Sequence, residues 1–279
     1  MNVNCAVHST LEPKGTSVMQ RAYQLGLYAL ILLSCLVQFS IYPAMAEDSQ
    51  TAREFYDKGD FKQASLMAEV QGGLEGYSLA LRAALAYGGH VARGKEAVEW
   101  LERAERLADK LMSFDDIGLR NRLSAAIVIS YRSKKQRSVS LVNNAKHLIE
   151  GLIEDYPNEA MVHGALAGWH SEISAAGFLP RLVFGASRGK AGQYFDKARS
   201  LNDAKISLNL EYAKYLARGN EKERNRAKVL LLSIIKENPE DAFERLLQEN
   251  ANKLLIAVNT GKKKVIKRII AEISAFPDF

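Results

Sequence analysis

The sequence predicts an all-α fold, a right-handed solenoid of helix pairs with a C-terminal capping helix. The main observation is a repeated spacing in which an alanine is followed by larger or small apolar residues four and seven positions later, and then by a helix-ending residue. The copies are Ala145-Ile149-Leu152-Pro157, Ala227-Leu231-Ile234-Pro239, Ala97-Leu101-Ala104-Asp109 and Ala191-Phe195-Ala198-Asp203. Residues at this spacing share one face of a helix. Each copy therefore predicts the second helix of a repeated helix pair.

Residues 1–46 have the features of an export signal. Arg21 provides the positive flank, an apolar run follows over residues 25–33, and Ala44-Met45-Ala46 offers small residues before a cleavage site. We expect cleavage after Ala46, with either Met1 or Met19 as the start. Residues 47–279 would then form one helical-repeat domain in the periplasm.

Two alternatives remain open for this segment. Leu32-Leu33-Ser34-Cys35 is similar to the lipobox of bacterial lipoproteins, in which the cysteine is acylated and anchors the protein to the membrane. The apolar stretch 22–41 also approaches the ~20 residues that span a bilayer, so it could remain as an uncleaved N-terminal anchor.

Composition excludes several classes of site after Ala46. Both cysteines, Cys5 and Cys35, precede it, so the domain has no disulfide framework, thiolate metal site or cysteine nucleophile. Removing Lys14, Arg21 and Glu12 from 38 basic and 32 acidic residues leaves a net charge of about +5. This mild excess favours anionic surfaces over nucleic acid as partners.

The first unit of the domain carries the clearest motif. The run Phe55-Tyr56-Asp57-Lys58-Gly59-Asp60-Phe61, followed by Ala64, resembles a tetratricopeptide repeat. The resemblance implies that an aromatic residue closes the first helix, Gly59 makes the turn, Phe61 opens the second helix and Ala64 lies where the helices cross. Glycine suits the turn because the end of a helix often needs a left-handed residue.

Later units are longer and less regular. The alanines that begin the close-packed face of each second helix are Ala64, Ala97, Ala145, Ala191 and Ala227. We expect a helix over residues 117–131 and interpret the basic residues 132–137 as a solvated turn. A further helix over residues 161–175 carries Leu166, Trp169 and Ile173.

Residues 177–190 are the most unusual segment. They are apolar at first, and their glycines and proline forbid one continuous helix, so we expect an inserted loop. Long connections within compact repeats are often functional. The candidate binding residues here are Trp169, His170, Phe178, Arg181, Leu182, Val183, Phe184, Arg188 and Lys190. Trp169, His170 and Glu172 could line a cavity with Phe178, Leu182 and Phe184. Alternatively, Trp169 lies in the core and the loop covers a widened gap between repeats. If the loop leaves part of its apolar face exposed, that face would be a docking patch with a basic rim, which favours an acidic or lipidic partner.

Residues 164–202 also carry a family resemblance. They open with Gly-x-Leu-x-Gly-x-Trp, continue to Val-Phe-Gly and close with Tyr-Phe-x-Lys-Ala-x-x-Leu. This pattern is similar to the regulator of microtubule dynamics family. The resemblance implies a tetratricopeptide-like fold and, for bacterial relatives, an exported protein; a role at microtubules does not carry over.

The C-terminal region continues as helices. Leu208, Tyr212 and Tyr215 mark one helix, and further helices are expected over residues 227–236, 241–258 and 263–275. The last of these is basic through Lys262, Lys263, Lys264, Lys267 and Arg268. As a solenoid cap it needs no further function; as an amphipathic helix it would contact an anionic membrane surface.

No catalytic motif is present. Residues 185–190 lack the spacing and the Ser or Thr of a phosphate loop, and His163 and His170 lie two helical turns apart, too far for a metal pair on adjacent turns. We therefore expect no enzyme, metal or cofactor. The predicted function is an exported scaffold that holds a protein partner of the bacterial cell envelope. The alternative is a small-molecule-binding protein, acylated at Cys35, that is associated with a solute transporter.

Overall fold

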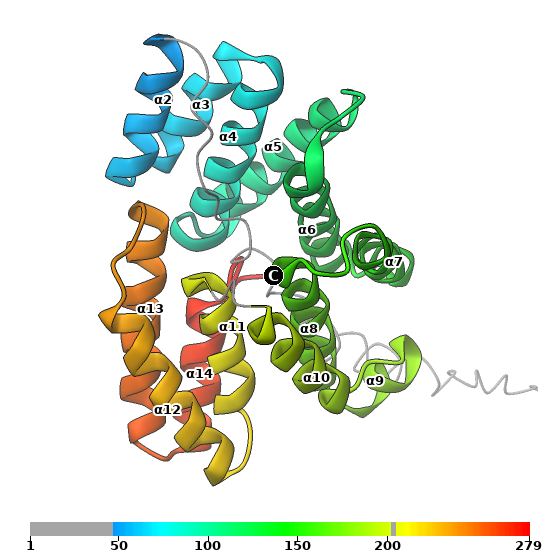
Figure 1. Cartoon of the computed structure of the whole chain (residues 1–279), viewed down its shortest axis with the longest axis vertical. Helices are drawn as coiled ribbons and strands as arrows, with labels where there is room; N and C mark the ends of the chain where they lie inside the picture. The colour runs from blue at the N-terminus through cyan, green and yellow to red at the C-terminus, as the bar shows by residue number, and fades with distance from the viewer. Residues whose placement is uncertain (1–46, 202–204) are drawn as a thin grey trace, which may run out of the picture.

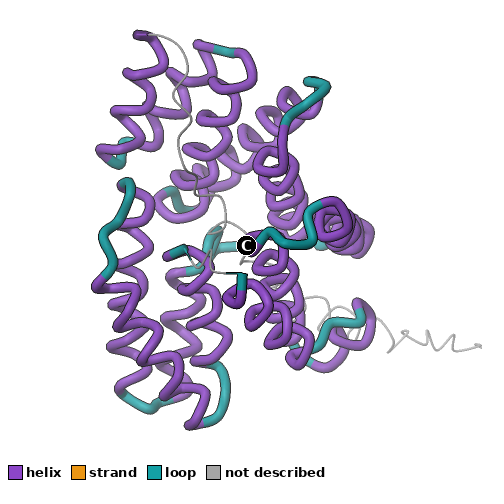
Figure 2. Tube along the Cα trace, viewed as in Figure 1, coloured by secondary structure: helices purple, strands orange, loops and turns teal. Residues whose placement is uncertain are grey.

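The computed structural model describes residues 47–201 and 205–279, and within these ranges its regular structure is all helical (Figure 2). The predictions for residues 1–46, including cleavage after Ala46 and acylation of Cys35, lie outside the described residues. The helices are α2 (Glu47–Lys58), α3 (Phe61–Gln71), α4 (Gly73–Ala86), α5 (Gly94–Met112), α6 (Gly118–Gln136), α7 (Val139–Asp155), α8 (Ala160–Ala175), α9 (Phe178–Phe184), α10 (Arg188–Ser200), α11 (Ile206–Ala217), α12 (Glu221–Lys236), α13 (Ala242–Asn259) and α14 (Lys263–Ile273). A π-helical turn, η3 (Tyr87–Val91), follows α4 directly. The predicted all-α class is confirmed for this part of the chain.

The first helix pair forms as its local sequence predicts. Gly59 adopts a left-handed φ of 91° between α2 and α3. The Asp60 carboxylate then accepts a hydrogen bond from a backbone N–H in the first turn of α3, which caps that helix. The Tyr56 and Phe61 rings pack edge to face with their centroids 5.2 Å apart, and Ala64 is fully buried.

The repeated alanines mark the places where helices pack most closely. Ala64, Ala97, Ala145, Ala191 and Ala227 are each at most 1% exposed. Successive helices contact each other from α2 through α8, and again from α11 through α14, while α8 packs against α10 with α9 beside it. The prediction that neighbouring helices pair is therefore confirmed.

A helix near the end of the chain, α13, packs against the first helix pair, α2 and α3. In Figure 1 α13 lies below α2, with the ends of the two helices next to each other, and the two helices are in contact. A β-carbon at Gly59 would lie 3.4 Å from the Cβ atom of Ala242. The Phe61 and Phe243 rings approach to 6.1 Å, and the Arg245 side chain donates to a backbone carbonyl of α2. The late helix α13 is thus in contact with the first helix pair of the described chain.

The closed arrangement leaves little of the inner helices exposed. All twelve residues of α11 and thirteen of the sixteen residues of α8 are buried. The segment 274–279 leaves α14 and enters the centre of the molecule, where the chain terminus is marked in Figure 1. Both faces of these helices are therefore covered, which explains why their sequences lack a clear polar side.

Three boundaries differ from the sequence prediction. Helix α6 continues to Gln136, so residues 132–136 form its last turn. The prediction of a solvated turn at residues 132–137 is wrong for Lys134, which is only 1% exposed. Helix α12 begins at Glu221 rather than Ala227, because Asn220 forms a capping box before it. The segment 177–190 contains α9 and the start of α10, separated by breaks at its glycines.

Candidate functional site

The candidate residues divide between the core and the surface. Trp169 and His170 lie on α8 and are each 1% exposed. The indole Nε1 of Trp169 donates to the Val142 carbonyl oxygen over 3.4 Å, and Lys146 lies 5.7 Å from the ring. Trp169 is therefore a packed core residue.

His170 sits in an aromatic stack. Its ring packs edge to face against Trp169 at 5.0 Å and lies nearly parallel to Tyr194 at 5.8 Å. Burial, together with the positive charges of Lys190 and Lys146, lowers the pKa of His170 to about 4. The imidazole is thus neutral near pH 7 and acts as a flat packing surface.

Helix α9 presents apolar side chains to solvent. Phe178 is 72% exposed, Leu182 68% and Val183 63%, whereas Pro180 is buried. Glycines with left-handed φ values precede and follow the helix, Gly177 at 127° and Gly185 at 62°. Both conformations are unfavourable for other residues, so the two glycines allow the chain to fold this short helix out from α8 and back into α10.

Two further candidates adjoin this surface. Leu179 is 42% exposed, while Phe184 is only half-buried and packs against the core. We call the set Phe178, Leu179, Leu182 and Val183 the α9 patch. Arg181, within α9, and Lys190, just beyond it, are both exposed. No acidic residue occurs between Glu172 and Asp196, so the rim of the patch is basic.

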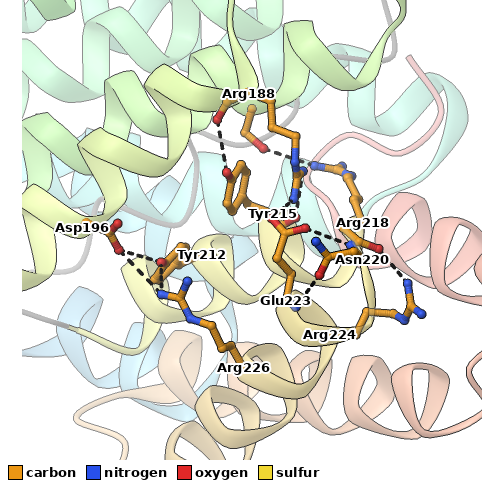
Figure 3. A network of polar contacts seen from close by, with 11 residues as sticks. Arg188, Asp196, Tyr212, Tyr215, Arg218, Asn220, Glu223, Arg224 and Arg226 are labelled. Carbon is orange, nitrogen blue, oxygen red and sulfur yellow. Dashed lines mark hydrogen bonds and ion pairs between the residues drawn. The ribbon is translucent and has the colours of Figure 1, made fainter.

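Arg188 has a structural position instead. Its guanidinium donates to Glu223 Oε1 over 2.6 Å and to the Tyr215 carbonyl oxygen over 3.3 Å, and it stacks 4.2 Å above the Tyr215 ring. In turn the Tyr215 hydroxyl donates to the Arg188 carbonyl oxygen over 3.1 Å. These contacts fasten α10 to α11 and α12 (Figure 3), so Arg188 contributes little charge to the rim.

The same network continues on either side of Arg188 (Figure 3). The Arg218 guanidinium pairs with the buried Glu172 carboxylate of α8. The Tyr212 hydroxyl donates to Asp196 Oδ1 over 2.6 Å and accepts from Arg226 over 2.7 Å. Burial, with the nearby Asp196 carboxylate, raises the pKa of Tyr212 to about 12. The network is thus a joint between four helices.

A second cluster lies at the centre of the molecule, and sequence reasoning missed it. Lys134 from α6 is buried there and donates to the Phe276 carbonyl oxygen over 2.7 Å. The buried ion pair of Glu211 and Lys214 on α11 spans 2.7 Å. Burial lowers the pKa of His90 to about 3, and the charge of Lys214 contributes. One feature of the sequence could have indicated that Lys134 is buried. Two small residues, Ser130 and Ser133, precede it in α6, and small side chains leave room for a neighbouring segment to pack closely.

Other kinds of site find little support in the described residues. No group of three or more His, Cys, Asp or Glu there is placed to hold a metal ion. No helix in residues 47–201 or 205–279 has the length and apolar character to cross a membrane. A surface hollow of about 660 Å³ is open to solvent and lined by Glu221, Lys222, Asn225, Arg226 and Val229 of α12, none of which is a candidate binding residue.

Comparison with known proteins adds no relative: no protein-family model, curated protein or solved structure matches the chain.

Proposed function

We propose that this protein is an exported, non-catalytic scaffold with a tetratricopeptide-like, right-handed arrangement of helices, which binds a protein partner of the bacterial cell envelope through the α9 patch. The observation that carries the proposal is the exposure of Phe178, Leu182 and Val183 on one ordered helix. Contiguous exposed apolar side chains are uncommon on the surface of a monomer and typically mark an interaction site.

The construction of α9 supports a binding role. The buried Pro180 and Ala186 fix the segment to the body of the protein, so its exposed side chains are held in place before a partner arrives. Pre-organised side chains lose less conformational entropy on binding than flexible ones. Because the rim residues Arg181 and Lys190 are exposed and basic, the expected partner offers an apolar surface bordered by acidic groups.

The packing of Trp169 argues for this scaffold over the small-molecule alternative. A ligand cavity beside the indole would need space that the Val142 carbonyl, His170 and Lys146 now occupy. The contact of α14 with an anionic membrane is a weaker secondary proposal. Ile266, Ile270 and Ile273 are buried, so such a contact would be electrostatic and sensitive to salt.

The partner is tested by placing a photo-crosslinking amino acid at Val183 in the full-length protein in its native envelope. The matched control carries the same amino acid at Val229 on α12, which is 70% exposed. We expect one protein adduct at Val183 that is absent at Val229 and is lost when Leu182→Ser is added. With the purified partner, Leu182→Ser should weaken binding by about tenfold or more, because burial of a leucine contributes roughly 1.5–3 kcal/mol.

Other outcomes contradict the proposal. Adducts with lipid at Val183 would make α9 a membrane contact, and equal labelling at Val183 and Val229 would remove the reason for assigning a site. Export is tested separately by mass spectrometry of the mature N-terminus. We expect it at Glu47, whereas an acylated Cys35 would favour the lipoprotein alternative.

A further inference from the structure

The segment 274–279 is buried in the centre of the molecule and makes specific contacts with the residues around it. Ser274, Ala275 and Phe276 are at most 2% exposed. The backbone N–H of Phe276 donates to the Gly89 carbonyl oxygen, and the backbone N–H of Gly94 donates to Asp278 Oδ2, each over 2.8 Å. The segment is thus bound through its main chain and through one acidic side chain.

The Phe276 ring is closely surrounded by residues of α6 and η3. It packs 4.7 Å from the Tyr131 ring of α6, and Gly88 and Gly89 of η3 lie against it. A β-carbon at Gly88 would be 3.3 Å from the ring, and one at Gly89 would be 3.2 Å from Ala275 Cβ. The π-helical form of η3 adds weight, because such turns occur frequently at functional sites.

Lys134 completes the contacts. Its amine donates to the Phe276 carbonyl oxygen over 2.7 Å. Burial lowers the pKa of this amine to about 7, although the negative charges of Glu172 and Asp278 act in the opposite direction. A buried amine is unfavourable unless it has a specific acceptor, and a segment that only filled space would pack as well against an apolar side chain.

The conformation of the bound segment points the same way. Phe276 has a left-handed φ of 50°, which a residue other than glycine adopts only when its surroundings impose it. The lining groups therefore dictate the shape of the segment.

We propose that η3, the start of α5 and the last turn of α6 form a peptide-binding site, which the chain's own residues 274–279 occupy. A protein partner enters it with a segment that adopts the same turn and that carries an aromatic residue and, two positions later, a carboxylate. This site is separate from the α9 patch and does not depend on it.

The experiment uses a chain that ends at Ile273 and a fluorescent hexapeptide with the sequence of residues 274–279. Fluorescence anisotropy should show saturable one-to-one binding. Replacing the phenylalanine that corresponds to Phe276 with alanine should weaken binding at least about tenfold, since burial of a phenylalanine contributes roughly 1.5–3 kcal/mol. A peptide of the same composition in scrambled order is the control.

Two protein variants test the lining. Lys134→Met in the shortened chain should weaken peptide binding by about tenfold, because it removes a hydrogen bond from a charged or polar donor. Lys135→Met is the matched control, since that lysine points outward to Glu102 on α5. Equal effects of the two variants would overturn the assignment of Lys134.

The proposal also fails if the shortened chain keeps its helical circular dichroism and binds no peptide. If that chain does not fold, the full chain with Phe276→Ala provides the test. It should bind the free peptide and exchange its amides faster over residues 87–94, whereas the unchanged chain should resist both. A Phe276→Ala chain that binds no peptide would assign residues 274–279 to the core alone.

Discussion

Several ionisable side chains are buried in this protein, and His170 shows the effect most simply. The charged form of a buried imidazole loses its hydration, so the neutral form is favoured. Because the pKa of His170 is lowered to about 4, the folded protein binds fewer protons at His170 than the unfolded chain between pH 6.5 and pH 4. The stability that His170 contributes is present above pH 6.5 and is lost as the pH falls toward 4.

The first prediction follows from this difference. In urea unfolding measured from pH 7 to pH 4, the free energy of unfolding should fall less steeply for His170→Gln than for the unchanged protein. The difference between the two curves should open below pH 6.5. Parallel curves would mean that the pKa of His170 in the folded state is not lowered.

The second prediction concerns the network of Figure 3. Arg218→Met should destabilise the protein by about 3–5 kcal/mol, because it leaves the buried Glu172 carboxylate without its ionic partner. Arg226→Met is the control in the same network: its partner Asp196 is 65% exposed, and the ion pair should contribute about 1 kcal/mol or less. Equal losses on thermal or urea unfolding would contradict the assignment.

The sequence pattern predicted which apolar residues are buried better than it predicted where the charged side chains lie. The alanines at close crossings and the core position of Trp169 follow from helical spacing alone. Lys134 does not, because a basic run is usually solvated, and its burial depends on residues 274–279 arriving from the far end of the sequence. Arg188 pairs with Glu223, which lies 35 residues further along the chain, and helical spacing does not reveal that contact either. Arg188 was therefore expected at the rim of the loop and lies instead in the joint between helices.

At the scale of elements, helix ends are set by their caps. Asn220 and Glu223 exchange hydrogen bonds in a capping box at the start of α12. The third prediction is that Asn220→Ala costs about 1 kcal/mol of stability. Asn225→Ala, an exposed position inside the same helix, should be neutral or slightly stabilising because alanine favours helix. Reversed effects of these two variants would show that the cap does not hold α12.

The predicted loop at 177–190 shows the limit of sequence rules for elements. Gly177 and Gly185 do break the helix, as predicted, but seven residues between them suffice for α9. Pro180 falls within its first turn, where a proline lacks no hydrogen bond. A segment that is too short to be a stable helix alone is held by packing against α8.

At the scale of the whole molecule, the closure between α13 and α2 was not predictable. Helix pairing is local, whereas closure depends on small rotations that accumulate along the chain. Phe243 lies at this closure, 3% exposed, against Phe61 of α3 and His90 of η3. Its contacts therefore join parts of the chain that the sequence pattern for neighbouring helix pairs does not connect.

The fourth prediction tests that closure. Phe243→Ala should destabilise the protein by about 3–5 kcal/mol, as large-to-small core changes do. Amide hydrogen exchange should rise in α2 and α3 more than in α8 and α10. Val229→Ala, at an exposed site on α12, is the control and should change neither. Uniform loss of protection would mean that α2 and α3 are not held by the closure.

The same closure bears on how the molecule is made. Arg245 contacts Asp57 across 188 residues of sequence, and Asp278 contacts Gly94 across 184. As the chain folds, the early helices can pair with one another, but their inner face stays exposed to water until residues 274–279 are added to it. We therefore expect closure to come late in folding, and a chain that lacks this segment would expose the buried Lys134 amine.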